Sequence, residues 1–233
     1  MLNSILLQDC TSANVANALE SGFHTVVIPC AAPHPPSGVL PRNTGEWIAN
    51  ALALRVAGQL GDALVAPVVS TGVAPVVSTG VAPVTCAVPD GSAAVDPALA
   101  DRLAETCLPL AEQGFRNLVV LPGNLHPFTV SAVIDSVQER IFAAELPAGL
   151  IAYGDALQRR HWQQEFLARS LGGTAAPENL PGDLAETSML LALRPDLARG
   201  KPLAATADLG AALLDYLSAE MAREIRARIL CRR

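Results

Sequence analysis

Short apolar runs alternate along this chain with longer segments in which apolar and polar residues recur at helical spacing. The apolar runs are rich in β-branched residues and lie at 25–29, 63–69 and 117–121. Runs of this length predict strands. Because the runs are apolar on both faces, they are typical of strands buried within a parallel sheet.

The longer segments predict helices, and each has recognisable ends. They run from Thr11 to Ser21 with Thr11 or Ser12 as N-cap, from Thr44 to Leu60, and from Pro97 to Gln113 with Gly114 as the closing residue. Strands that alternate with helices predict an α/β fold: a three-layer α/β/α sandwich with a mostly parallel central sheet. The length of the chain favours a single domain over residues 1–233.

In such a fold, functional side chains gather where the parallel strands end. Two segments follow predicted strands directly, at 30–45 and at 122–128. We therefore expect the residues that carry chemistry to lie in these two segments.

An eight-residue sequence that begins inside the second predicted strand is repeated once without change. Residues 66–73 read Ala-Pro-Val-Val-Ser-Thr-Gly-Val, and residues 74–81 are identical. The period is too short for a solenoid repeat. A recent duplication that lengthens a loop is favoured over a dedicated binding loop, and an even number of residues preserves the alternation of side chains. We expect the duplication to enlarge a flap near the site.

The C-terminal third contains an apolar stripe at helical spacing, which favours a role in the core, with contact between subunits as the alternative. The stripe consists of Leu213, Leu214, Leu217, Met221 and Ile225.

Charge and composition exclude several classes of function. The net charge of −6 and a pI near 5.2 argue against a nucleic-acid partner, and the cluster of arginines from 223 to 233 is interpreted as a solvated helix face. No apolar run reaches the ~18 residues of a membrane span, and the chain starts without the features of a signal peptide. Five cysteines without a Cys-x-x-Cys pair favour reduced thiols, so a cytoplasmic location is expected.

Several segments, in order along the chain, resemble one enzyme family. Residues 6–20 and 25–29 are similar to its opening helix and first strand, and Pro29, Leu40, Pro41 and Thr44 match its first motif. Residues 114–121 are similar to the strand that precedes its second motif. Glu186, Thr187 and Ser188, followed by Pro195, are similar to its Glu-Thr-Ser signature. The chain thus resembles the creatininase family of creatinine amidohydrolases.

This resemblance implies a creatininase-like α/β fold, usually assembled as a hexamer, in which two divalent metal ions activate a water that opens a cyclic or linear amide. Most of the implied ligand positions hold other residues here. Three positions of the first motif fall on His34, Pro36 and Gly45, and two of the second fall on Asn124 and His126. Of the family's polar groups, only Glu186 is clearly retained.

The resemblance places His34, His126 and Glu186 at one pocket, where they could perform acid–base chemistry or hold a single divalent ion. No other cofactor is expected. Substrate contacts are assigned to Asn124, Cys30, Thr187 and Ser188, with Cys30 also considered as a nucleophile activated by His34. The alternative interpretation makes the histidines and Asn124 ordinary loop residues, and Glu186 a brace for a helix beginning near Thr187.

Two functional hypotheses follow from these residues. The first is a repurposed enzyme that acts on a small amide, lactam or related metabolite through hydrolysis, ring closure or elimination. The second is a non-catalytic family member that serves as a binding or scaffolding subunit. An ordinary two-metal hydrolase with differently aligned loops is a weaker third. In each case the expected partners are a small molecule and further copies of the chain.

Overall fold

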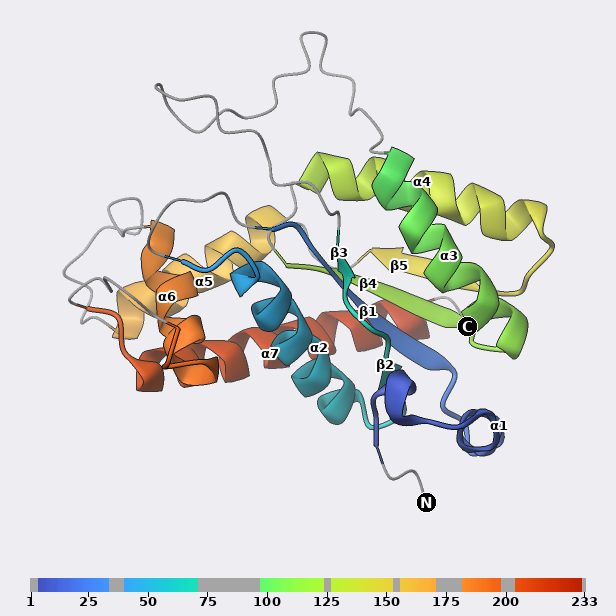
Figure 1. Cartoon of the computed structure of the whole chain (residues 1–233), viewed down its shortest axis with the longest axis horizontal. Coiled ribbons are helices and arrows are strands. Elements are labelled where there is room, and N and C mark those ends of the chain that lie inside the picture. Colours follow the sequence, from blue (N-terminus) through green and yellow to red (C-terminus); the bar gives the residue numbers. More distant parts are fainter. Residues whose placement is uncertain are drawn as a thin grey trace, which may run out of the picture.

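The computed structural model describes residues 4–33, 40–70, 97–123, 127–152, 156–170, 182–197 and 204–231. The repeated segment from residue 71 onward lies outside the described residues, and so does the flap that we expected there. The remaining residues build one sheet with helices on both of its faces (Figure 1).

The sheet is parallel at every described pairing, as predicted. Its order is β2-β1-β4-β5, and β3 also pairs with β1. The strands are β1 (Thr25–Ala31), β2 (Ala63–Val65), β3 (Val69–Ser70), β4 (Asn117–Pro122) and β5 (Gly149–Ala152). Strands β1 and β4 occupy the centre of the sheet, so each has a neighbouring strand on both sides.

The second predicted strand, 63–69, is wrong in one respect: it is divided into β2 and β3. Ala66 still donates its N–H to the Val27 carbonyl at 2.9 Å. The next residue is Pro67, which has no N–H to continue the ladder. Pairing with β1 resumes where Val69 lies beside Cys30.

The helices are a 3₁₀ turn η1 (Leu7–Asp9), α1 (Ser12–Glu20), α2 (Thr44–Leu60), α3 (Pro97–Gln113), α4 (Pro127–Ala143), α5 (Ala156–Ser170), α6 (Gly182–Leu193) and α7 (Ala207–Leu230). The predicted bounds of α2 and α3 are confirmed, and α1 is one residue shorter at each end. Thr11 is its N-cap and forms a capping box with Asn14. Gly114 has a φ of +110° after α3, a conformation that suits glycine. None of the described helices is long and apolar enough to cross a membrane.

Alternate residues of β1 enter two separate hydrophobic cores. Val26, Ile28 and Cys30 contribute to a core formed with α1, α3 and α4. Val27 enters the other core, which is formed with α2, α5, α6 and α7. Figure 1 shows α3 and α4 on one side of the sheet and α2, α6 and α7 on the other. This arrangement confirms the predicted three-layer sandwich.

The apolar stripe of α7 lies inside the second core, so the first of its two interpretations is confirmed. All five of its residues are at most 1% exposed. The arginines of α7 lie on the outside, where Arg223 pairs with Glu220 and Arg228 pairs with Glu224. These ion pairs fit the interpretation as a solvated helix face.

Candidate functional site

The carboxyl ends of the two central strands meet the first turn of α2. The Gly123 N–H, directly after β4, donates to the Cys30 carbonyl of β1 at 2.6 Å. A Cβ atom added to Gly123 would lie 3.0 Å from the Gly45 carbonyl oxygen and 3.1 Å from the Ala49 Cβ. The start of α2 is therefore packed closely against the end of β4, and glycine at 123 permits this approach.

A small cavity opens at this junction, and Glu186 lines it. The side chain of Glu186 is half-buried and comes from α6. The other described residues around the cavity are Gly45, Ile48 and Leu52 of α2, Gly123, Gln163 of α5 and Met189 of α6. The structure thus brings Glu186 to the edge of the sheet where functional groups were expected.

The alternative interpretation, in which Glu186 caps or braces a helix beginning near Thr187, is wrong about where the helix begins and about the cap. Helix α6 begins at Gly182, so Glu186 lies in its second turn. Its carboxylate is one turn beyond the N–H groups that a capping side chain would accept from.

Thr187 and Ser188 follow Glu186 on α6, but the structure buries both. They are 1% and 0% exposed, and neither is among the described residues that line the cavity. Neither hydroxyl has a hydrogen-bond partner within the described part of the chain. The backbone of Ser188 lies against α7, where a Cβ added to Gly210 would come within 1.8 Å of the Ser188 carbonyl oxygen. These two residues pack helices together.

Cys30 lies on the opposite face of the sheet from Glu186, in the core with α3. Its side chain is 1% exposed. Burial raises the pKa of the Cys30 thiol, and the nearby Cys107 raises it further. A thiol whose pKa is raised in this way stays protonated near neutral pH, whereas an activated nucleophile needs a lowered pKa.

His34, Asn124 and His126 lie outside the described residues. The described chain stops at Pro33 and at Gly123, which come after the carboxyl ends of β1 and β4. The same is true of the implied ligand position at Pro36. Glu186 and Gly45 are therefore the members of the implied metal centre that the structure describes.

Of these two positions, Gly45 does not fit the two-metal centre that the resemblance implies. Gly45 is buried at the start of α2 and offers no side chain where the resemblance implies an aspartate. Among the described residues, no group of three or more His, Cys, Asp and Glu side chains could hold a metal ion. A dinuclear site needs carboxylate and imidazole ligands around both ions. The described side of the cavity supplies one carboxylate and one carboxamide.

Gln163 is the functional candidate that sequence reasoning missed. It lies on α5, and its side chain lines the cavity together with Glu186. Gln163 and its neighbour Gln164 lie in the middle of the helix and belong to no recognisable motif. Only the packing of the two helices in the same layer brings Gln163 to the cavity.

Arg194, directly after α6, contacts Trp47 near the start of α2. Its guanidinium lies 5.2 Å from the centroid of the Trp47 ring and makes two hydrogen bonds to Asp196, at 3.1 and 2.9 Å. The hydrogen bonding between them raises the pKa of Arg194 and lowers the pKa of Asp196. This contact links the two helices that carry Gly45 and Glu186.

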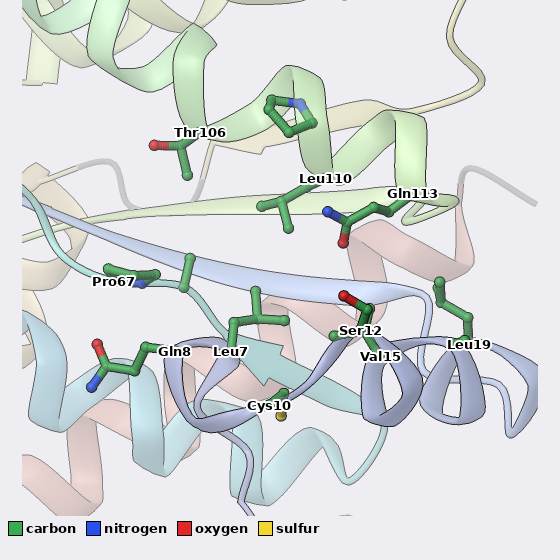
Figure 2. Close-up of a pocket in the computed structure, with 13 residues that line it drawn as sticks. Leu7, Gln8, Cys10, Ser12, Val15, Leu19, Pro67, Thr106, Leu110 and Gln113 are labelled. Carbon is green, nitrogen blue, oxygen red and sulfur yellow. The ribbon is translucent and has the colours of Figure 1, made fainter.

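A second hollow lies at the other core and contains none of the predicted site residues. Its volume is about 530 Å³, and its walls come from η1, α1, α3 and the link between β2 and β3 (Figure 2). The polar side chains of Gln8, Ser12, Thr106 and Gln113 lie among apolar ones, without a charged residue in the described lining. Among the described lining residues, the hollow therefore offers hydrogen bonds and the Cys10 thiol, but no carboxylate, imidazole or amine.

Comparisons with solved structures support the fold. The chain resembles a crystal structure of creatinine amidohydrolase (creatininase) with a TM-score of 0.71 at 19% identity, covering 97% of this chain and 98% of that one. A structure described as creatininase Mn gives a TM-score of 0.70 at 19% identity, with 97% and 99% covered. A putative creatinine amidohydrolase from Bacteroides fragilis NCTC 9343 gives 0.60 at 16% identity, with 97% and 96% covered.

At such low identity, a structural likeness establishes the fold alone. By sequence, none of the curated proteins compared with the chain matches it. The sequence model of the creatininase family, described as creatinine amidohydrolase, does match, and the match extends over residues 8–208. It spans the described strands, the cavity and Glu186. The chain belongs to the creatininase family.

Proposed function

We propose that the protein acts on a small amide, lactam or related metabolite at the cavity where β1 and β4 meet α2. The observation that carries this proposal is the position of Glu186: a half-buried carboxylate, retained from the family, at the carboxyl end of the central strands. Ligands of parallel α/β folds bind at this edge of the sheet. The described part of the cavity measures about 10 Å³, which is room for one water-sized group beside Glu186.

The proposed chemistry is proton transfer. The Glu186 carboxylate would take a proton from an attacking water as the water oxygen bonds to the amide carbon, and would return that proton to the leaving nitrogen as the C–N bond breaks. His34 and His126, which the resemblance assigns to the same pocket, are the proposed partners, since imidazole titrates near neutral pH. Gly45 supports this proposal over the family's two-metal mechanism, because it replaces a ligand with a residue that has no side chain. One divalent ion held by His34, His126 and Glu186 is the other form of the same site.

Replacing Glu186 tests the proposal directly. We expect Glu186→Gln to lower turnover of a responsive amide or lactam by about 10²–10⁴, which is the range for loss of one general acid or base. The matched control is Glu139→Gln, which removes a carboxylate from the exposed side of α4. The assay is a screen of small lactams, cyclic ureides and primary amides, followed by chromatography and mass spectrometry. Equal activity in the two variants would remove Glu186 from the mechanism.

The metal content of the purified protein separates the two forms of the site. Elemental mass spectrometry after dialysis is compared between the parent and a His34→Ala/His126→Ala variant. One ion per chain that is lost in the variant supports a mononuclear site. Two ions per chain would restore the family's dinuclear hydrolysis and contradict the role given to Gly45.

A non-catalytic binding subunit is the second candidate function. It is favoured by the same absence of a side chain at Gly45 and by the burial of Thr187 and Ser188. This candidate predicts that compounds bind at the cavity with dependence on Glu186 but are recovered unchanged after prolonged incubation.

A further inference from the structure

We infer that the hollow between α1 and α3 is a docking groove for an amphipathic helix of another protein, in which lysine or arginine flanks the apolar stripe. The groove is separate from the candidate active site. It lies on the face of the sheet that α1, α3 and α4 cover, whereas Glu186 belongs to α6 on the other face. The inference therefore does not depend on the proposed function.

The two long walls of the groove are each one stripe of a helix. Four residues of α1, at positions 12, 15, 16 and 19, line one side, and four residues of α3, at positions 106, 109, 110 and 113, line the other. Figure 2 shows labelled residues of both helices on opposite sides of the hollow. Residues with this spacing share one face of a helix, and each stripe extends about 10 Å, or two turns.

The groove leaves apolar surface incompletely covered. Leu7, Val15 and Leu19 are only partly buried and pack against the edge of the core, while Ala66 and Leu110 are buried more deeply. The volume of about 530 Å³ is far larger than the space of a single water. Helices pack by placing rows of side chains between the rows of their neighbours. A third helix therefore fits here with apolar residues three or four positions apart over two turns.

Carboxylates flank the lining residues on both helices. Before and after the lining residues of α1 come Asp9 and Glu20, and Glu105 and Glu112 lie one turn before and one turn after Pro109 of α3. All four carboxylates are exposed, so they are available to a partner. Opposite charges across an interface steer and select the partner. This arrangement favours a helix with cationic flanks and disfavours an anionic one.

Backbone chemistry adds to the same preference. Pro109 lies inside α3 and has no N–H, so the Glu105 carbonyl does not receive the helical hydrogen bond from position 109. A lysine or arginine beside the groove can donate to that carbonyl. Among the arginines of the described chain, Arg102 of α3 lies one turn before the lining residue Thr106, and its guanidinium donates to the Ser70 carbonyl.

The test uses a defined peptide and the full chain. The probe is a fluorescent peptide of about 16 residues, with leucine at helical spacing and lysine on the flanks, which is long enough to form a helix. Binding is measured by fluorescence anisotropy. We expect saturable binding, and we expect a peptide with glutamate in place of lysine to bind at least about tenfold more weakly.

Two variants of one helix locate the bound peptide. Ala16 lines the groove and is exposed, so Ala16→Trp should obstruct it and weaken peptide binding about tenfold or more. Ala13 is also exposed on α1 but is not among the described lining residues, so Ala13→Trp should bind like the parent. Circular dichroism checks folding, and Ala16→Gln replaces Ala16→Trp where folding is impaired.

A second pair of variants tests the carboxylates. We expect Glu105→Gln/Glu112→Gln to weaken binding of the lysine peptide about threefold at low salt, with a smaller effect at high salt. The matched control is Asp135→Asn/Glu139→Gln, which removes two exposed carboxylates from α4 and changes the net charge equally. Equal weakening by the two double variants would overturn the role of the carboxylates beside the groove.

Three further results would overturn the docking of a basic helix. The first is an absence of peptide binding, and the second is equal binding by Ala16→Trp and Ala13→Trp. The third comes from sedimentation velocity: if Ala16→Trp lowers the oligomeric state of the chain and Ala13→Trp does not, the groove holds a second copy instead of another protein. Unchanged sedimentation, with peptide binding lost only in Ala16→Trp, supports the inference.

Discussion

Gly210 of α7 lies directly against the backbone of α6. The contact leaves no room for a side chain larger than the hydrogen atom of glycine. A Cβ at position 210 would lie 1.8 Å from the Ser188 carbonyl oxygen and 2.7 Å from the Met189 backbone nitrogen. Because both atoms belong to a helix backbone, α6 and α7 would have to separate. We expect Gly210→Ala to lower the free energy of unfolding by about 3 kcal/mol, measured by urea denaturation.

Gly58 provides the control for this prediction. It is also inside a helix, but it is exposed on α2 and an added Cβ would meet nothing within 4 Å. Gly58→Ala should therefore raise the free energy of unfolding by about 0.5–1 kcal/mol. Similar effects of the two substitutions would contradict the close crossing of α6 and α7.

The candidate site could be predicted residue by residue only where a family motif survives. Glu186 is part of such a motif, and the structure places it at the expected edge of the sheet. The signature alone could not separate Glu186 from Thr187 and Ser188, because it does not say which side of α6 faces the cavity. Gln163 could not be predicted at all, since its place at the cavity depends on how α5 packs against the other helices of its layer.

At the scale of elements, the sequence predicts best where helix ends have distinctive residues. Helix α3 is bounded by Pro97 and Gly114, and both signals depend on backbone geometry that few other residues satisfy. Backbone geometry also explains why the predicted strand over 63–69 is interrupted at Pro67. The apolar pattern continues through this residue, but a ladder hydrogen bond cannot.

Strand β3 lies within the first copy of the repeat, so the second copy can be deleted without removing this strand. Deleting residues 74–81 leaves the sequence from 66 to 73 unchanged, so the residues that pair with Cys30 and Ala31 are still present. The connection to α3 becomes shorter, which changes the cost of loop closure by only about 0.3 kcal/mol. We expect the shortened chain to unfold in urea with nearly the same free energy as the parent.

A destabilising comparison shows whether that measurement is sensitive to β3. Val69 is 7% exposed in the same strand, so Val69→Asp would bury an unpaired charge and should cost about 2 kcal/mol or more. A comparable loss on deletion of 74–81 would show that the second copy contributes packing that the first copy cannot supply.

The whole molecule responds to alkaline pH through two thiols buried in one core. Burial raises the pKa of Cys107 from its ordinary value of 9.0 to about 12, and it raises the pKa of Cys30 as well. Above pH 9, the unfolded chain releases these protons while the folded protein keeps them. The free energy of unfolding should therefore fall as pH rises from about 9 to 12, by up to about 1.4 kcal/mol per pH unit for each thiol.

Substitution of Cys107 isolates this contribution. We expect Cys107→Ala to reduce the slope of unfolding free energy against pH between 9 and 11, measured by urea denaturation at several pH values. The control is Cys231→Ala, since Cys231 is exposed at the end of α7. The smaller core side chain lowers the free energy of unfolding by a similar amount at every pH, so this loss does not change the slope. An unchanged slope in Cys107→Ala would contradict the contribution of the Cys107 thiol.

The N-terminal segment has a consequence for how the protein can be handled. The Ile5 carbonyl accepts the Val65 N–H at 2.8 Å, and Leu6 pairs with Val65 along the outer side of β2. An uncovered strand at this edge would offer free backbone groups to a strand of another molecule, which is a common route to aggregation. Purification tags or fusion partners that displace residues 5 and 6 would remove this protection, so they are better attached beyond α7.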